Sequence, residues 1–452
     1  MTVSLTTSTY SNIMLLPLRP GSSQSNIRIS SPSVFGEPFN HLRFRNEQIV
    51  NTANYQVPEN DVEGEAFAGT ALYGGVLFPA FGHFIAESLH RLWASYQDPA
   101  LGNVPIVFHS TGPGLHKDRT LPSWMTQIFA LSGIDAKRLV IVNRPITFET
   151  LIVPSQGSLL GKGPVTPDYG TIFPPQRPEP MVEREGHLYI SRSRFIHGGS
   201  YLGEMLVEDV LRETGKFRII HPQDYPVTEV VAMLESCQSA IFAEGSAIHI
   251  IELCRAPVPK IFAILRRKKN AWCSFYQQMV TKRSGAHAEQ EVRACLTSLG
   301  WSHKVGASMG GVHASAVQDI PQLLKAISAF IGLPMREPWD LEVRNAQALS
   351  LVSMIMDPRA TPGHPDSEGP MGLLTVLQQQ VLDLDILPFA IPKPPRKIAI
   401  AEDAASDDDD DTDRRDDGDD GAGAAELVPK LRKPAPADAC GARRLRRLRK
   451  EK

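Results

Sequence analysis

The sequence has few cysteines, no long hydrophobic run and almost no net charge. Its five cysteines are an odd number without close pairs, which argues against a complete disulfide framework or a zinc ribbon and favours a reducing compartment. No run of roughly 18 apolar residues is present, so we expect no transmembrane helix. The first residues lack the basic start and apolar core of a secretory signal. We therefore expect a cytoplasmic protein.

The net charge of −3 conceals an uneven distribution of charge. An acidic run near residue 410 is followed by a basic end at residues 443–449, and the rest of the chain is nearly neutral. A nearly neutral folded part lacks the excess of basic residues that binds nucleic acids, so no nucleic-acid partner is expected. Residues 397–452 cannot bury enough apolar surface to fold, which predicts a disordered tail. Its basic end either contacts an anionic membrane peripherally or stays solvated.

Apolar patterns predict two series of alternating strands and helices. In the first series, strands are expected at residues 71–77, 104–108, 139–142 and 150–153, with helices at 81–96 and 122–132. In the second, strands are expected at 187–190, 217–220, 239–242 and 259–264, with helices at 203–214, 226–237 and 247–254. Such alternation is typical of parallel sheets covered on both faces, so we predict two doubly wound α/β lobes.

The same patterns predict the division of the chain. The length of 452 residues favours two folded domains with appendages. Further helices are expected at 271–299, 320–331 and 373–384. The predicted parts are an irregular segment at 1–65, a first lobe at 66–165, a Pro-rich linker at 166–186, a second lobe at 187–335, a Pro-rich extension at 336–396 and the tail at 397–452.

Residues 242–249 place Gly245 and Ser246 between a predicted strand and a predicted helix. Gly245 lets a ligand approach the backbone, and Ser246 could cap the helix. Free N–H groups at a helix N-terminus favour phosphate, and ligands of open α/β sheets gather beyond the carboxyl ends of the strands. The alternative is an ordinary capped turn, with His249 as a buried histidine.

Two arginines, Arg192 and Arg194, directly follow another strand of the same lobe. The planar guanidinium group donates two parallel hydrogen bonds, which suits a diphosphate. A surface arginine pair in a loop is the alternative. A strand end with arginines and a neighbouring glycine turn together favour a nucleoside diphosphate site.

In the first lobe, His83, Glu87 and His90 have the spacing of one face of a helix. Histidine and glutamate are zinc ligands, but a single helix seldom supplies the convergent geometry that a metal requires. His83 and Glu87 could instead face a cleft as hydrogen-bonding groups or as a general base. A solvated polar face remains the third interpretation.

Four of these features, in this order, resemble glycosyltransferase family 61, whose members include capsular polysaccharide biosynthesis proteins. They are residues 83–92, residues 189–194, Glu229 in a predicted helix and residues 243–249, and the resemblance covers residues 70–335. It implies a GT-B fold, in which two Rossmann-like lobes face a cleft. It also implies inverting transfer of a sugar from a nucleoside diphosphate sugar to a hydroxyl of a glycan or lipid-linked acceptor, without a metal or another cofactor.

The resemblance also assigns roles to residues of this sequence. His83 and Glu87 would be the catalytic groups on the acceptor side. Arg192, Arg194, Gly245 and Ser246 would bind the donor diphosphate, and Glu229, Glu244 and His249 would contact the donor or its sugar. Many members have histidine where this chain has Glu244, so Glu244 either takes a sugar hydroxyl or supports the loop.

Two rival functions remain at this point. A non-catalytic relative could hold a nucleotide sugar or a glycan within a polysaccharide assembly. An α/β-hydrolase is disfavoured, because the sequence around Ser246 lacks the second glycine of the Gly-x-Ser-x-Gly elbow.

Overall fold

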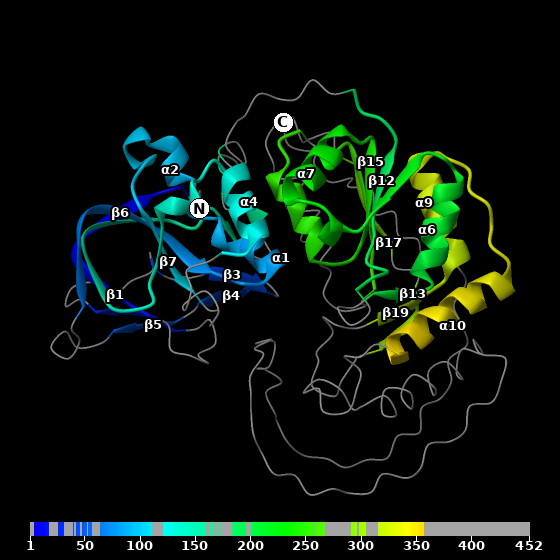
Figure 1. Cartoon of the computed structure of the whole chain (residues 1–452), viewed down its shortest axis with the longest axis horizontal. Coiled ribbons are helices and arrows are strands. Elements are labelled where there is room, and N and C mark those ends of the chain that lie inside the picture. Colours follow the sequence, from blue (N-terminus) through cyan, green and yellow to red (C-terminus); the bar gives the residue numbers. More distant parts are fainter. Residues whose placement is uncertain are drawn as a thin grey trace, which may run out of the picture.

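The computed structural model contains two α/β lobes that pack against each other through a layer of helices (Figure 1). It describes residues 4–17, 26–30, 39, 42–45, 48–51, 53–56, 64–110, 121–159, 163–164, 166, 169, 172, 183–195, 200–256, 258–266, 291–295, 298–303 and 315–356. No helix among these residues has the length and apolar content needed to cross a membrane. The predicted helix at 373–384, the predicted tail and most of the predicted linker lie outside the described residues.

The first lobe is built on a seven-stranded sheet in the order β5-β2-β1-β9-β6-β7-β8. Its strands are β1 (Thr7–Leu16), β2 (Asn26–Ser30), β5 (Ala53–Gln56), β6 (Glu65–Leu77), β7 (Ile106–Ser110), β8 (Leu139–Ile141) and β9 (Ile146–Pro154). β6 pairs in parallel with β7 and β9, and β7 with β8, whereas β1 is antiparallel to β9 and β2.

The prediction of an irregular segment at residues 1–65 is therefore wrong. β1 pairs along most of its length with β9, and Ile13 and Leu15 at its end are fully buried. Its first half is polar and largely exposed, so the strand has little apolar periodicity of its own. Backbone hydrogen bonds to β9 define it, and a local pattern does not contain that information.

The second lobe is built on a five-stranded parallel sheet in the order β14-β12-β15-β16-β17. Its strands are β12 (His187–Ile190), β14 (Phe217–Ile220), β15 (Ser239–Ala243), β16 (Lys260–Ile264) and β17 (Glu291–Cys295). The predicted helix at 271–299 is wrong at β17, which pairs with β16 from Lys260 opposite Glu291 onward. The free edge of β16 supplies the hydrogen-bonding partners that make this segment a strand.

Smaller elements complete the described fold. The remaining strands are β3 (Leu42–Arg45), β4 (Gln48–Asn51), β10 (Ser158–Leu159), β11 (Gly163–Pro164), β13 (Tyr201–Leu202), β18 (Ser298–His303) and β19 (Ser315–Gln318). The helices are α1 (Phe81–His83), η3 (Phe84–Ser88), α2 (Ala94–Gln97), η4 (Pro99–Leu101), α4 (Ser123–Leu131), η5 (Ala136–Arg138), α6 (Glu204–Glu213), η6 (Pro222–Asp224), α7 (Val227–Ser236), η7 (Ser246–Leu253), α9 (Ile320–Ile331) and α10 (Asp340–Met356).

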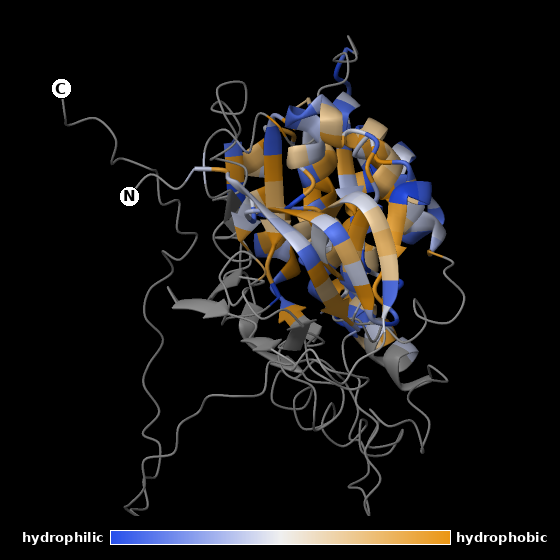
Figure 2. Ribbon diagram, turned by 90° about the vertical axis from the view of Figure 1, so that its left-hand side faces the viewer, coloured by the Kyte–Doolittle hydropathy of each residue, from blue (hydrophilic) through white to orange (hydrophobic). Residues whose placement is uncertain are grey.

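Alternate residues along the strands of each sheet face two different cores. One core lies between the sheets and joins Leu72 and Phe108 of the first lobe to Phe242 of the second, together with α4, α7 and η7. A second core lies under α6 and α9, on the outer face of the second sheet. Seen from the side of the first lobe, apolar residues predominate along the strands (Figure 2). The second lobe thus has the predicted helices on both faces.

The first lobe departs from the predicted doubly wound pattern. Its described helices contribute to the core between the sheets, whereas the opposite face of its sheet carries a separate core that includes Ile13, Phe39 and Tyr73. The antiparallel strand β1 extends this face. The outer face is therefore covered by chain that the strand-helix alternation did not reveal.

The helix predictions were mostly confirmed. α4, α6, α7 and α9 match the segments expected at 122–132, 203–214, 226–237 and 320–331. The segment expected as a helix at 247–254 is a 3-10 helix, η7. α10 was missed because it lies within the predicted Pro-rich extension; it packs against α6 and β13, and Ser350 accepts a hydrogen bond from the backbone of Gly203.

Candidate active site

Two of the predicted site residues of the second lobe, Arg192 and Gly245, meet at the switch point of its sheet. β12 lies between β14 and β15. The next strand of this sheet along the chain, β14, lies on one side of β12, and the strand after it, β15, lies on the other side. In open parallel sheets, ligands bind in the crevice beyond the strand ends at such a point. The ends of β12 and β15 carry Arg192 and Gly245, respectively.

Arg192 lies directly against Gly245. A Cβ on Gly245 would be 2.2 Å from Nη1 and 2.6 Å from Cζ of Arg192, so any side chain there would displace the guanidinium group. Arg192 is largely buried, and its guanidinium also packs over the ring of Phe195. Glycine at this position therefore leaves the space that the Arg192 side chain occupies.

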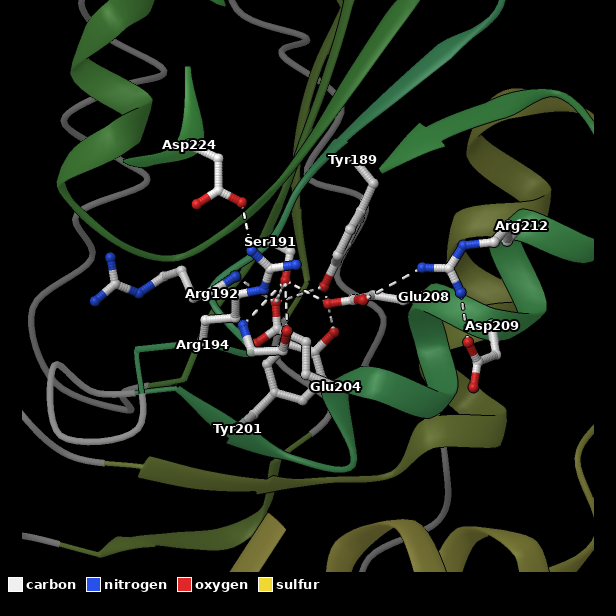
Figure 3. Close-up of polar contacts among 11 residues, drawn as sticks. Tyr189, Ser191, Arg192, Arg194, Tyr201, Glu204, Glu208, Asp209, Arg212 and Asp224 are labelled. Atoms are coloured by element: carbon white, nitrogen blue, oxygen red, sulfur yellow. Dashed lines mark hydrogen bonds and ion pairs between the residues drawn. The ribbon is translucent and has the colours of Figure 1, made fainter. Parts of the chain in front are cut away.

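Arg194 does not join Arg192 at this turn. Its side chain is exposed and forms an ion pair with Asp224 in η6, after β14 (Figure 3). The expectation that both guanidinium groups lie at one site is thus wrong. Because β12 lies between β15 and β14, Arg192 contacts Gly245 after β15, whereas Arg194 contacts Asp224 after β14.

Glu244 supports the loop at the end of β15. Its carboxylate accepts a hydrogen bond from the backbone N–H of Arg266 at 2.8 Å, and the Nε of Arg266 donates to the backbone carbonyl of Glu244 at 3.0 Å. Both side chains are buried. These bonds join the ends of β15 and β16, which is the second of the two roles expected for Glu244.

Ser246 does not cap η7, so that prediction is wrong. The N-cap residue is Gly245 in an extended conformation, and no side chain caps the helix. His249 is buried, as the simpler interpretation predicted, and its Nδ1 lies 3.0 Å from Oε1 of Glu252. Glu229 lies in the first turn of α7 with an exposed side chain, on the connection that follows β14.

The first-lobe motif touches this turn directly. A Cβ on Gly82 of α1 would lie 2.9 Å from Cβ of Ser246 and 3.1 Å from Cδ2 of His249. The two lobes also contact where Gln127 of α4 accepts a hydrogen bond from the backbone N–H of Val227 at 2.7 Å. Residues about 160 positions apart in the chain are thereby brought together, with Gly82 against Ser246.

His83 and Glu87 form a close pair. Nδ1 of His83 lies 2.5 Å from Oε1 of Glu87. The side chain of Glu87 is 0% exposed, whereas that of His83 is 36% exposed. Glu87 therefore presents its carboxylate to the histidine ring and leaves the ring as the accessible member of the pair.

His90 does not share their face. The segment continues from α1 into a π-helical turn and then a further turn, so the regular spacing predicted for these side chains is lost. His90 is buried, and its Nδ1 donates to the carbonyl of Ser158 at 2.9 Å. Among the described residues, no group of three or more His, Cys, Asp or Glu residues is arranged to hold a metal ion.

Glu252 is a polar residue of this region that the sequence analysis missed. Its carboxylate lies between His249, at 3.0 Å, and Nε2 of His90, at 3.6 Å. Burial by itself would raise the pKa of Glu252, but the neighbouring His249 and His90 lower it to about 2. Because His90 belongs to the first lobe, this buried charge links the lobes. The spacing of three residues between His249 and Glu252 on one helix was the sequence feature that could have predicted this contact.

A second missed carboxylate, Glu204, lies below Arg192 (Figure 3). Its Oε1 accepts hydrogen bonds from the Arg192 backbone N–H at 2.8 Å and from the Tyr189 hydroxyl at 2.9 Å. Burial raises the pKa of Glu204 to about 7. Nothing in the local sequence distinguished this first residue of α6 from an ordinary solvated helix start.

Fold and site together define an α/β protein with polar groups at the strand ends of the parallel sheet of the second lobe, beside a histidine and a carboxylate from the first lobe. Residues 81–258 match the family described as Glycosyltransferase 61. The resemblance predicted from the sequence is thus confirmed over this span, and the match indicates glycosyltransferase activity in glycan synthesis. The matched span contains both halves of the site. No curated protein matches the sequence.

Proposed function

We propose that this protein is an inverting glycosyltransferase that moves a hexosyl or pentosyl group from a nucleoside diphosphate sugar to a hydroxyl of a glycan or lipid-linked acceptor. The observation that carries the proposal is the position of Arg192, held against Gly245 at the switch point of the second sheet. Gly82, the residue directly before the first-lobe motif, contacts the same turn. A donor site and an acceptor site would therefore adjoin, as in the GT-B arrangement.

Arg192 would bind the donor diphosphate and stabilise it as it departs. An arginine donates charge-assisted hydrogen bonds to phosphate oxygens, and the free N–H groups at the start of η7, from Gly245 and Ser246, would add to them. Arg194, exposed and paired with Asp224, would contact the outer part of the donor. Cations and a helix N-terminus can neutralise the leaving group without a metal, so we propose a metal-independent reaction.

His83 would be the general base. An inverting displacement requires a base that reaches the acceptor hydroxyl, and only His83 of the pair presents its ring to solvent. Glu87, 2.5 Å from Nδ1, would fix the orientation of the ring and stabilise the imidazolium ion that forms. The other ring nitrogen, Nε2, would take the proton.

A panel of uridine and guanosine diphosphate sugars tests the donor assignment. A sugar nucleotide that binds the folded protein raises its melting temperature with concentration, and Arg192→Ala should abolish most of that rise. Glu213→Gln, an exposed change far along α6, is the control. No stabilisation of the wild-type protein by any sugar nucleotide would contradict the proposal.

Transfer assays test the chemistry. With the best-binding donor, His83→Ala should lower kcat by about 10²–10⁴-fold while donor binding is retained, because general base catalysis is worth about that much. Addition of a chelator should leave turnover unchanged. Full activity of His83→Ala, or loss of activity with chelator, would contradict the mechanism. Donor binding without turnover on any acceptor would favour the non-catalytic binding module.

A further inference from the structure

The polar cluster below Arg192 has a feature that its sequence did not predict: two buried carboxylates share one hydroxyl group. Oγ of Ser191 lies 3.1 Å from Oε1 of Glu204 and 2.5 Å from Oε1 of Glu208 (Figure 3). Both glutamates come from the first two turns of α6, and both are buried. Ser191 and Arg192 are consecutive residues at the end of β12.

The hydrogens of this cluster can be counted. Tyr201 can donate to the Tyr189 hydroxyl at 2.6 Å, which leaves the Tyr189 hydrogen for Glu204. The Ser191 hydroxyl has a single hydrogen and accepts one from the Ser193 backbone N–H at 2.9 Å, yet it also contacts both carboxylates. Both contacts are hydrogen bonds only if the two carboxyl groups together hold one proton. The raised pKa of Glu204, about 7, agrees with a proton held near neutral pH.

The charges around the cluster decide how firmly that proton is held. Burial and the charge of Glu208 disfavour the ionised form of Glu204, whereas hydrogen bonds from the Arg192 backbone and the Tyr189 hydroxyl and the positive charge of Arg192 favour it. From α10, the non-titrating Gln347 and Ser350 contact the neighbouring Gly203. Arg192 is thus a cation whose charge favours the ionised form of Glu204.

Around Glu208 lie two further titratable groups. Arg212, one turn along α6, is 3.5 Å from its carboxylate. His221, at the end of β14, lies within the electrostatic reach of Glu208, Arg194 and Asp224, and burial lowers its pKa. A substitution of Glu204 leaves Arg212 and His221 unchanged. A change in pH dependence in such a variant is therefore due to the carboxyl pair.

Resting on the proposed function, we propose that Glu204 is a positioning residue of the donor site and that binding of a diphosphate to Arg192 is coupled to uptake of one proton by the Glu204–Glu208 pair. Glu204 holds the backbone N–H of Arg192 at 2.8 Å and so fixes the strand end from which the guanidinium reaches Gly245. A bound anion cancels the charge of Arg192, and the carboxyl pair then retains its proton more firmly. Donor affinity is consequently linked to pH.

Calorimetric titration with a uridine or guanosine diphosphate sugar tests this coupling. Both phosphates of such a donor are diesterified and do not titrate near neutral pH, so a proton taken up on binding comes to the protein. Titrations in two buffers of different ionisation enthalpy count that proton. The wild-type protein should take up part of a proton at pH 7.5, and its Kd should weaken up to about tenfold from pH 6.5 to 8.5, since one pKa unit corresponds to a factor of ten.

Glu204→Gln keeps the acceptor oxygen for the Arg192 backbone and imitates the protonated form. It should bind the donor at pH 8.5 as tightly as the wild-type protein does at pH 6.5, with no proton uptake, whereas Glu204→Ala should bind weakly at every pH. Glu213→Gln, at the exposed end of the same helix, should keep wild-type behaviour. Melting curves of all variants verify that they are folded.

The outcomes separate this inference from the proposed function. If the wild-type protein binds a donor and Arg192→Ala weakens binding, but Glu204→Gln keeps the proton uptake and the pH dependence, the coupling is wrong and the donor site stands. Unchanged donor affinity in Glu204→Ala would remove its positioning role. If no donor binds the wild-type protein, the proposed function itself fails.

Discussion

The pKa values of two buried glutamates of the second lobe are shifted in opposite directions. Glu252 lies between His90 and His249, and its pKa is lowered to about 2. Glu204 lies among hydroxyl groups and beside Glu208, and its pKa is raised to about 7. Both are fully withdrawn from water, so burial alone does not decide the charge. The neighbours decide it: histidines compensate the desolvation of Glu252, whereas hydroxyl groups and a second carboxylate do not compensate that of Glu204.

The opposite pKa shifts agree with the positions of the two glutamates in the fold. Glu252 connects the lobes, because its buried carboxylate lies 3.6 Å from Nε2 of His90 in the first lobe. Glu204 lies under a group that is expected to bind an anion, where a charge that can change is useful. A strongly shifted carboxyl group beside a strand-end site is the kind of feature that functional sites show.

Removing the carboxylate at the lobe interface should have the largest effect on stability. Glu252→Ala leaves His90 and His249 buried without their partner, and breaking a buried pair in this way costs about 3–5 kcal/mol of unfolding free energy. Denaturant unfolding monitored by fluorescence measures this cost. A loss below about 1 kcal/mol, the value typical of surface pairs, would show that the interlobe pair does not stabilise the fold.

The pH dependence of stability separates the two glutamates. Glu252 has a folded pKa below the ordinary 4.5, so its contribution is present above pH 4.5 and is lost as the pH falls toward 2. Glu204 has a raised folded pKa, so its contribution is present below pH 4.5 and is lost as the pH rises through 7.

Glu204→Gln should therefore gain stability relative to the wild-type protein as the pH rises from 4.5 to 8, by roughly 3 kcal/mol in all, because one pKa unit corresponds to 1.36 kcal/mol. Unfolding curves of both proteins across that range measure the difference. A constant difference at all pH values would mean that Glu204 has an ordinary pKa in the folded protein.

A methyl group on the glycine turn should weaken the donor site without touching either carboxylate. Gly245→Ala places a Cβ 2.2 Å from Nη1 of Arg192, so the guanidinium must move. Donor affinity should fall by about 10–100-fold, the worth of one or two charge-assisted hydrogen bonds. The control is Gly102→Ala, a substitution in the first lobe at an ordinary φ. Gly215→Ala is unsuitable because Gly215 has a positive φ. Unchanged donor affinity in Gly245→Ala would place the diphosphate elsewhere.

The sequence predicted the second lobe better than the first. Its strands are short buried runs between helices with apolar faces, and such patterns are local, so β12, β14, β15 and β16 were found. β1 and β17 were missed because neither is a continuous apolar run: the first half of β1 is polar and largely exposed, and β17 contains Glu291 and Arg293. The site followed the same rule. Arg192 and Gly245 were found because each follows a strand, whereas the partners of Arg194 and His90 depend on tertiary contacts.

The exposed charges at the end of α6 provide the smallest and last comparison. Arg336 pairs with Glu213 and Glu342, and these hydrogen bonds raise the pKa of Arg336 and lower that of Glu342, with all three side chains substantially exposed. Water and salt screen such pairs, so Glu213→Gln should change the unfolding free energy by less than about 1 kcal/mol, and 1 M salt should reduce even that. The cost of Glu252→Ala should persist in salt, because its charges are shielded from ions. If both substitutions responded equally to salt, the environment of Glu252 would be as wet as that of Glu213, and the contrast between buried and exposed carboxylates would not hold.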